Sequence, residues 1–555
     1  MQELINLKEA ARMLGVKAET LRNWDNSGRL KAIRIGSRGD RRYEKSKIQA
    51  ILGQSDPNKY EIQEMDGSLH IFFGYINGFL LGLKNNFGKS ITKHIIVSQN
   101  GHVKIAYPHQ ELLELGEFLT NKLIGDTKLI DKTINEFNYY LKETERLIEL
   151  FHDKNINKKE LIEIFEYSEE IYEKGMSWSM IIEPLDIYLI KKIKENLNVS
   201  TSKFSEFFGI LTSPMEESFV LKEKKKSLEI LREINKDASL KNIFIKNTVE
   251  KIIEKISGLK IIKKIDEHKK DYAWMNGDYV KSSPLEVTDV IKSLKEYLNN
   301  NINVNQELLE INNYIKELKI KKDQVFSKID FNKEMENILF LTEKIGAMHD
   351  WRKESFLKSQ FLFELLLQNI SQKYKIDIDI LRFSLPEEII QYLKTNKIDK
   401  DKILLRKKYS LVLSGIDGHK IFYNKEALEI ENKEFSFGDK EVFSLIKGMP
   451  ASLGKVVGRA VVAYSSDEAI KKIQKGDILI TSMTRPDFVP AMKVAGAIVT
   501  NEGGITCHAS IVSREFKIPC VVGTRIATKV INDGDIIEVN GNHGIVYIIK
   551  KGDIN

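Results

Sequence analysis

The chain has 555 residues, a mass of 63.9 kDa, a net charge of +7 and 42% apolar residues. Three or four domains with real hydrophobic cores fit in this length, which excludes a disordered chain. Only two cysteines occur, Cys507 and Cys520, which argues against a disulfide-dependent secreted protein and predicts a cytoplasmic one. The most apolar run, from His70, is too short and too interrupted by Gly and Asn to span a bilayer, so no membrane partner is expected.

The positive charge is concentrated at the N-terminus. Residues 1–52 hold twelve Lys and Arg against six Asp and Glu, a local balance of +6, so the rest of the chain is close to neutral. A basic small domain on a neutral body indicates one local polyanion partner. Within this domain the pattern predicts two short helices around Gly15, two strands around a glycine-containing turn in residues 30–43, and a last helix from Glu44.

That order of elements resembles MerR-type and excisionase-type DNA-binding domains, over nearly the whole of residues 1–53. The resemblance implies DNA as a partner, with the second helix in the major groove and a wing on the phosphates. The implied contact residues are Thr20, Arg22 and Trp24 on the helix, and Arg38, Arg41, Arg42 and Tyr43 on the wing. Two alternatives stay open, namely solvated arginines around a purely structural core and a protein-docking module. One isolated unit makes few phosphate contacts and should bind DNA weakly. Tight DNA binding would therefore need a homodimer.

Residues 60–115 predict a small mixed α/β segment, because HIIVSQNGHVKIAYP alternates apolar and polar residues around Asn100-Gly101, a favoured hairpin turn. Residues 116–430 predict a helical region. The stretch between Gly125 and Gly346 contains only four glycines, and apolar residues recur at three- and four-residue steps.

Residues 446–550 predict a separate α/β domain. Eleven of the 33 glycines fall between Gly448 and Gly544, where short apolar runs alternate with brief helical patterns. The predicted strands are VVGRAVVAYS, DILITS, GAIVT, CVVG, DIIEVN and GIVYII, and the predicted helices are EAIKKI, PDFVPAMKV and HASIVSREF.

The segment TNEGGITCHAS places His508 after a glycine loop and at the start of a predicted helix. A neutral imidazole can attack phosphorus, and the N–H groups at a helix N-terminus, together with the loop backbone, can hold the resulting negative charge. Gly503 and Gly504 allow close approach of the backbone, Thr500 and Thr506 offer hydroxyls, and Arg514 follows on the same helix. The alternative is an ordinary capping or half-buried histidine. No metal site is predicted.

These residues, with KGMPASLGKVVGRAVV and KVINDGDIIEVNGNHGIVYII around them, resemble the phosphohistidine domain of the phosphoenolpyruvate (PEP) synthase, pyruvate phosphate dikinase and rifampin phosphotransferase family. The resemblance covers about a hundred residues. It implies a swivelling domain that carries phosphate on His508, with Thr506 as a candidate regulatory phosphorylation site. Ser510 and Lys517 depart from the family pattern, which commonly has Ala and Gly there, without removing a reacting group.

The family also carries an ATP-grasp domain and, in PEP synthase, a barrel after the histidine domain. Neither is evident in this chain, so the phosphoryl donor is expected to be ATP with Mg²⁺ on a separate ATP-grasp protein, or phosphoenolpyruvate, with no tightly bound cofactor. HDWRKESF and neighbouring motifs resemble the helical region that binds the acceptor in rifampin phosphotransferase. They imply Trp274, Asp350, Arg352 and Lys353 as acceptor contacts, with helix packing and salt bridges as the alternative.

The predicted fold is therefore multidomain and mostly α, with α/β end domains: an N-terminal winged helix-turn-helix, a central helical region and a C-terminal β/β/α swivelling phosphohistidine domain. Three functions remain. The first is a phosphotransferase, an enzyme incomplete without an ATP-grasp partner, that passes phosphate from His508 to an unknown small-molecule acceptor. The second is a DNA-binding regulator that senses metabolic phosphoryl potential. The third is an inactive scaffold.

Overall fold

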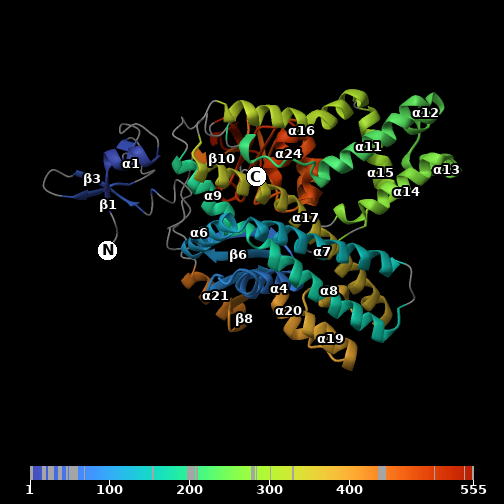
Figure 1. Cartoon of the computed structure of the whole chain (residues 1–555), viewed down its shortest axis with the longest axis horizontal. Helices are drawn as coiled ribbons and strands as arrows, with labels where there is room; N and C mark the ends of the chain where they lie inside the picture. The colour runs from blue at the N-terminus through green and yellow to red at the C-terminus, as the bar shows by residue number, and fades with distance from the viewer. Residues whose placement is uncertain are drawn as a thin grey trace.

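The computed structural model describes residues 4–14, 21–22, 25, 31–35, 40–45, 48, 60–67, 69–152, 156–196, 207, 210–276, 282, 284–299, 302–327, 331–434, 445–504, 507–524, 526–542 and 544–552. Figure 1 shows a small N-terminal head, a large helical body and a C-terminal domain against that body. In this part of the chain, no helix combines the length and the apolar character that crossing a lipid bilayer requires.

The head contains a three-stranded antiparallel sheet in the order β1-β3-β2, with α1 (Leu7–Leu14) against it. The two predicted strands are confirmed as β2 (Ile33–Ile35) and β3 (Asp40–Glu44). The third strand, β1 (Leu4–Asn6), was not predicted, because three residues are too few for an alternation to be visible.

A five-stranded antiparallel sheet in the order β4-β6-β5-β7-β8 forms one side of the body. The strands are β4 (Tyr60–Asp66), β5 (Lys93–Gln99), β6 (His102–Pro108), β7 (Ser410–Gly415) and β8 (Gly418–Tyr423). The predicted hairpin turn is confirmed, because Asn100 and Gly101 have φ angles of 52° and 89°, both positive as in a type I′ turn. The prediction of a helical region over 116–430 is wrong for β7 and β8, where apolar runs flank a tight Ile416-Asp417 turn.

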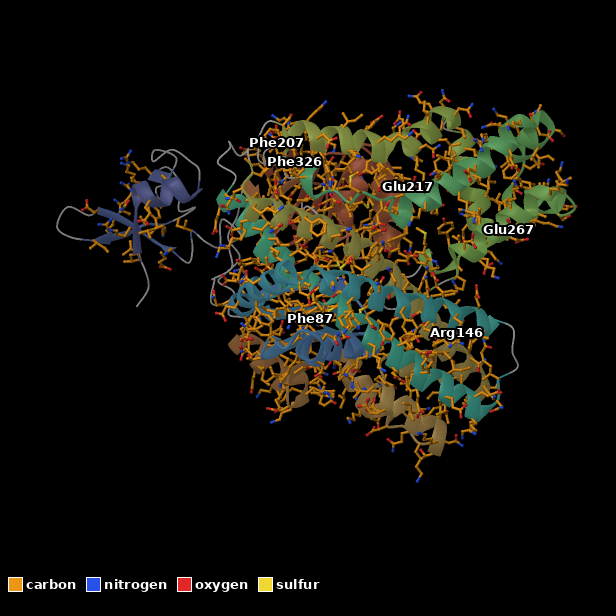
Figure 2. The ribbon with its side chains drawn as sticks, in the orientation of Figure 1. Phe87, Arg146, Phe207, Glu217, Glu267 and Phe326 are labelled. Atoms are coloured by element: carbon orange, nitrogen blue, oxygen red, sulfur yellow. The ribbon has the colours of Figure 1, made fainter. Side chains whose placement is uncertain are left out.

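The apolar run from His70 is a buried helical segment. It consists of α4 (Leu69–Asn77), a π-helical turn (Gly78–Gly82) and α5 (Leu83–Phe87), and it packs on α8 (Lys158–Ser179). A Cβ at Gly82 would lie 2.1 Å from Ser177 Cβ, so glycine is what lets the two helices approach. Phe87, labelled in Figure 2, then packs edge-to-face on Trp178. The two ring centroids are 5.6 Å apart.

Long helices complete the body, and α17, with 42 residues, is in contact with α7, α8 and α9. The helices are α6 (His109–Gly125), α7 (Thr127–His152), α9 (Ile182–Asn196), α17 (Lys333–Tyr374), α18 (Ile378–Arg382), α19 (Pro386–Thr395), α20 (Lys400–Lys408) and α21 (Asn424–Glu434).

A second group of helices, which we name the outer lobe, projects from the body around its own hydrophobic core of residues such as Leu231, Phe244 and Ile291 (Figure 1). It consists of α11 (Phe219–Lys236), α12 (Ala238–Lys246), α13 (Val249–Ile256), α14 (Lys260–Asp271), a 3₁₀ turn (Ala273–Asn276), α15 (Val287–Asn299) and α16 (Val304–Phe326). Figure 2 shows Glu267 on this lobe and Glu217 just before α11.

The C-terminal domain is an eight-stranded mixed sheet in the order β10-β14-β13-β12-β11-β15-β16-β9. Every predicted strand and helix of this domain is confirmed, whereas β9 (Leu445–Lys447) and β10 (Met449–Ser452) were not predicted. The other elements are β11 (Lys455–Val462), α22 (Ser466–Lys472), β12 (Ile478–Thr481), a 3₁₀ turn (Pro486–Phe488), α23 (Val489–Val494), β13 (Ala497–Thr500), α24 (His508–Glu515), β14 (Cys520–Val522), α25 (Ala527–Val530), β15 (Ile536–Asn540) and β16 (Ile545–Lys550).

A buried ion pair joins α19 to α20 in the body. Arg406 is fully buried and donates to both carboxylate oxygens of Glu388, at 2.7 and 2.8 Å, and to the carbonyl of Phe383 at 2.9 Å. Glu388→Ala leaves the guanidinium charge uncompensated, so we expect the free energy of unfolding of the body to fall by about 3–5 kcal/mol. Urea unfolding followed by circular dichroism measures this loss. The exposed neighbour in Glu387→Ala is the control and should change stability by less than about 0.5 kcal/mol.

Candidate functional site

His508 is the first residue of α24 and follows the loop that leaves β13. Cys507, the N-cap residue, has extended backbone angles (φ −72°, ψ 165°) and no side-chain capping bond. The N–H groups of the first helical turn, which have no acceptor within the helix, therefore lie beside the imidazole, where they favour negative charge. The ring itself is 3% exposed.

The two ring nitrogens of His508 have different surroundings. Nδ1 lies 2.9 Å from the hydroxyl of Thr484. Nε2 is buried and has no hydrogen-bond partner among the residues that the structure describes. A buried unpaired nitrogen is uncommon and calls for an explanation, and here the bond at Nδ1 leaves Nε2 as the nitrogen able to react.

Burial, and secondly the positive charge of Lys353, hold the pKa of His508 well below its usual value of 6.5. The imidazole stays neutral, and so nucleophilic, at pH values where an exposed histidine is protonated. We expect its rate of phosphorylation by phosphoramidate to stay flat between pH 7.5 and 5.5, while that of N-acetylhistidine falls about tenfold. Intact-mass spectrometry measures the first rate and NMR the second. A parallel fall of both rates would show that His508 titrates normally.

The glycine loop is held in place by its own backbone and by α24. Gly503 has a φ of +97°, and a Cβ there would lie 2.7 Å from Cys507 Sγ. The carbonyl of Gly504 accepts from the N–H of Cys507 at 3.0 Å and from the hydroxyl of Ser510 at 2.8 Å. Thr500 is buried at the end of β13, and its hydroxyl donates to the carbonyl of Glu502 at 2.6 Å. Thr506 lies outside the described residues.

Two cations of α17, Arg352 and Lys353, lie in the part of the body next to the C-terminal domain. Lys353 Nζ donates to the carbonyl of Thr484 at 3.2 Å, and burial lowers its pKa to about 8. Arg352 pairs with Glu183 at 2.9 Å, which helps to raise the pKa of the arginine, while its Nη1 is buried without a partner in the described part of the chain. Lys353 therefore joins the body to the C-terminal domain, and the guanidinium of Arg352, next to it in α17, is held by Glu183 within the body.

A cavity of about 1030 Å³ lies between the body and the C-terminal domain. Cys507 and Ala509, on either side of His508, line this cavity, whereas His508 itself lies just behind its wall. The C-terminal domain contributes Gly448, Met449, Met483, Thr484, Asn501, Glu502, Gly503, Gly504, Cys507, Ala509 and Gly523. The body contributes aromatic, acidic and basic side chains that include Tyr75, Tyr107, Glu61, Glu183, Asp186, His109, His349, Arg352 and Lys353.

Of the four predicted acceptor contacts, only Arg352 and Lys353 line this cavity. Asp350 is buried on another face of α17, where it accepts from the N–H of Phe219 at 2.9 Å, and burial raises its pKa to about 8. Trp274 is buried in the packing between α17 and the outer lobe, and its indole N–H donates to the carbonyl of Asp271 at 2.9 Å. Both residues occupy structural positions.

Arg514 lies in the last turn of α24, about 9 Å along the axis from His508 at the usual helical rise. Burial lowers the pKa of its guanidinium, and Tyr314 on α16 lies nearby. It therefore lies at the end of the helix away from the ring, against the outer lobe.

The sequence did not single out His349 and Asp186, although both line the cavity and their side chains are 2.6 Å apart. A signal was present in the motif HDWRKESF, because α17 places His349, Arg352, Lys353 and Phe356 at i, i+3, i+4 and i+7, one face of a helix. All four residues line the cavity. In the described residues, no group of three or more His, Cys, Asp or Glu side chains is arranged to hold a metal ion.

The predicted DNA contacts that lie in the described residues of the head differ in their exposure. Arg22 is exposed and Arg42 half-buried, whereas Arg41 Nε donates to Asp25 at 2.5 Å. The prediction for Tyr43 is wrong, because its ring is fully buried and its hydroxyl donates to the carbonyl of Leu21 at 3.3 Å. Thr20, Trp24 and Arg38 lie outside the described residues.

Comparison with known protein families agrees with this geometry. Residues 473–544, which hold the glycine loop and His508, match the model of the PEP-utilising enzyme mobile domain. The chain contains this mobile domain. Residues 4–55 match a helix-turn-helix domain, so the head belongs to that class.

Similar proteins named as phosphoenolpyruvate synthases share part of the chain. One from Archaeoglobus fulgidus, named as probable, is 48% identical over 142 residues, which is 24% of this chain and 18% of that protein. One from Aeropyrum pernix is 56% identical over 103 residues, 19% and 13% of the two chains, and one from Pyrococcus furiosus is 51% identical over 129 residues, 23% and 15%. The chain therefore spans less than a fifth of the length of these relatives. What the chain shares with the PEP-utilising enzymes is thus their mobile domain.

Proposed function

We propose that this chain is a phosphotransferase in which His508 Nε2 accepts a phosphoryl group and passes it to an acceptor held in the cavity. The observation that supports this best is the unpaired Nε2, beside a glycine loop that lines the same cavity as Arg352 and Lys353. Nδ1–H of His508 donates to Thr484, so that the lone pair on Nε2 attacks phosphorus. The first turn of α24 and the two cations then stabilise the negative charge of the phosphohistidine.

The donor is ATP with Mg²⁺ on a separate ATP-grasp protein, or phosphoenolpyruvate. The match to a PEP-utilising enzyme domain supports phosphoenolpyruvate as one of these donors. The test is an intact-mass measurement of the full chain after incubation with phosphoenolpyruvate, or with ATP, Mg²⁺ and the partner. An acid-labile adduct of one phosphoryl group is expected. No adduct with either donor would leave only the scaffold interpretation.

A second candidate function is a DNA-binding regulator whose phosphohistidine state alters the protein. The helix-turn-helix match over residues 4–55 favours it, together with the excess positive charge of residues 1–52. Phosphorylation adds negative charge at a buried site between domains, which can change how the mobile domain docks on the body. We expect the footprint on DNA upstream of the protein's own gene to differ between the phosphorylated and unphosphorylated chain. Identical footprints would remove this switch.

A further inference from the structure

A second histidine lies in the wall of the cavity and is held by a carboxylate. His349 on α17 is 6% exposed, and its Nε2 lies 2.6 Å from Oδ2 of Asp186 on α9. Since an ionised carboxylate can only accept, Nε2–H of His349 donates to Asp186. The lone pair is then on Nδ1, which has no hydrogen-bond partner in the part of the chain that the structure describes. A histidine oriented in this way by a carboxylate can take up a proton.

His349 is connected to His508 through α17. It precedes Lys353 by four residues, so the two side chains are neighbours on one helix face, with Cβ atoms about 6 Å apart. Lys353 Nζ donates to the carbonyl of Thr484, and the hydroxyl of the same threonine lies 2.9 Å from His508 Nδ1. The two histidines are therefore linked through Lys353 and Thr484, which both line the cavity.

From this arrangement we infer that the His349–Asp186 pair is the general base that activates the acceptor, which is an alcohol or a phenol. This inference rests on the proposed function. The acceptor oxygen attacks phosphorus while the N–P bond of phosphohistidine 508 breaks, and the electron pair returns to His508 Nε2. The proton of the acceptor hydroxyl moves to His349 Nδ1 and is later released to solvent. Asp186 positions the ring and stabilises the imidazolium that forms.

The reverse reaction tests this role without knowledge of the natural acceptor. By microscopic reversibility, His349 must then protonate the oxygen that leaves when His508 takes a phosphoryl group from a phosphate ester. Phenyl phosphate releases phenol, with a pKa near 10, and needs this proton, whereas 4-nitrophenyl phosphate releases a much more acidic phenol and does not. The two esters separate proton donation from every other contribution to the rate.

We expect His349→Gln in the full chain to slow phosphorylation of His508 by phenyl phosphate about 100-fold, but that by 4-nitrophenyl phosphate less than threefold. Asp186→Asn should give a smaller change in the same sense. His109→Gln is the matched control, because His109 Nδ1 also lies 2.5 Å from a carboxylate, Glu61, in the same cavity but on α6. It should affect both esters equally.

Phosphoramidate is included as a third donor in every variant. Normal loading of His508 by phosphoramidate in His349→Gln shows that this variant is folded and that the phosphohistidine chemistry is intact. Equal slowing of the two esters, or no transfer from phenyl phosphate in the unaltered chain, overturns the role of His349. Failure of phosphoramidate to load the unaltered chain overturns the proposed function itself.

Discussion

His508→Ala is expected to abolish the phosphoryl adduct completely. The variant removes Nε2, the buried nitrogen without a hydrogen bond among the described residues, and leaves the glycine loop and α24 without a nucleophile. The measurement is intact-mass spectrometry of the full chain after treatment with phosphoramidate, followed by mild acid to confirm a phosphoramidate bond. Since the ring is almost fully buried, some stability is also lost, so circular dichroism must show that the variant is folded.

A variant of a second histidine tests whether the phosphoryl adduct forms on a residue other than His508. His419 on β8 is exposed, and His419→Ala should keep the whole adduct. His508→Asn retains a polar side chain at the helix start and should also give no adduct. An adduct that survives both substitutions at His508 would place the reacting group elsewhere in the chain.

Gly503→Ala is expected to slow phosphorylation of His508 by about 100-fold, because the loop must move and displacement by about 1 Å is enough for such a loss. At a φ of +97° an alanine is strained, and its Cβ also collides with Cys507 Sγ at 2.7 Å. Cys507 directly precedes His508, so the collision shifts the start of α24. Rates of adduct formation with phosphoramidate measure the effect.

Gly534→Ala separates backbone strain from this collision. Gly534 belongs to the same domain and has a φ of +85°, but a Cβ there meets nothing within 4 Å. Both alanines should lower the free energy of unfolding by about 1–2 kcal/mol through the left-handed backbone. Only Gly503→Ala should lower the rate. Equal rates in the two variants would show that the geometry of the loop is not required for phosphorylation.

Predictions from the sequence were most accurate for elements that depend on residues close together in the chain. All six strands and three helices proposed for the C-terminal domain are present. They were predictable because glycines between the short apolar runs mark where each element begins and ends. The start of α24 at His508 follows from the same pattern. The turn at Asn100-Gly101 was predictable for a similar reason, since both residues tolerate positive φ.

The predictions that were wrong concern residues whose positions depend on tertiary contacts. Residues 410–423 follow a long helical region, and only their pairing with β5 makes them part of the body sheet. Within α17, Asp350 is two residues before Arg352, so the two side chains point about 200° apart around the helix axis. The motif therefore could not be assigned as a whole to the acceptor site. Tyr43 was predicted to contact DNA, and its burial could not be read from the sequence because the carbonyl that it binds, that of Leu21, is 22 residues away.

The pairing of β5 with β7 also sets an order of events on the ribosome. Gln99 ends β5 and Ser410 begins β7, so about 310 residues of chain must be made before the second strand exists. At ordinary rates of translation this takes roughly 15–60 s, during which one edge of the nascent sheet has no neighbour. The histidine domain follows β7 in the chain, so synthesis delivers it to a scaffold whose last strands have only just been made.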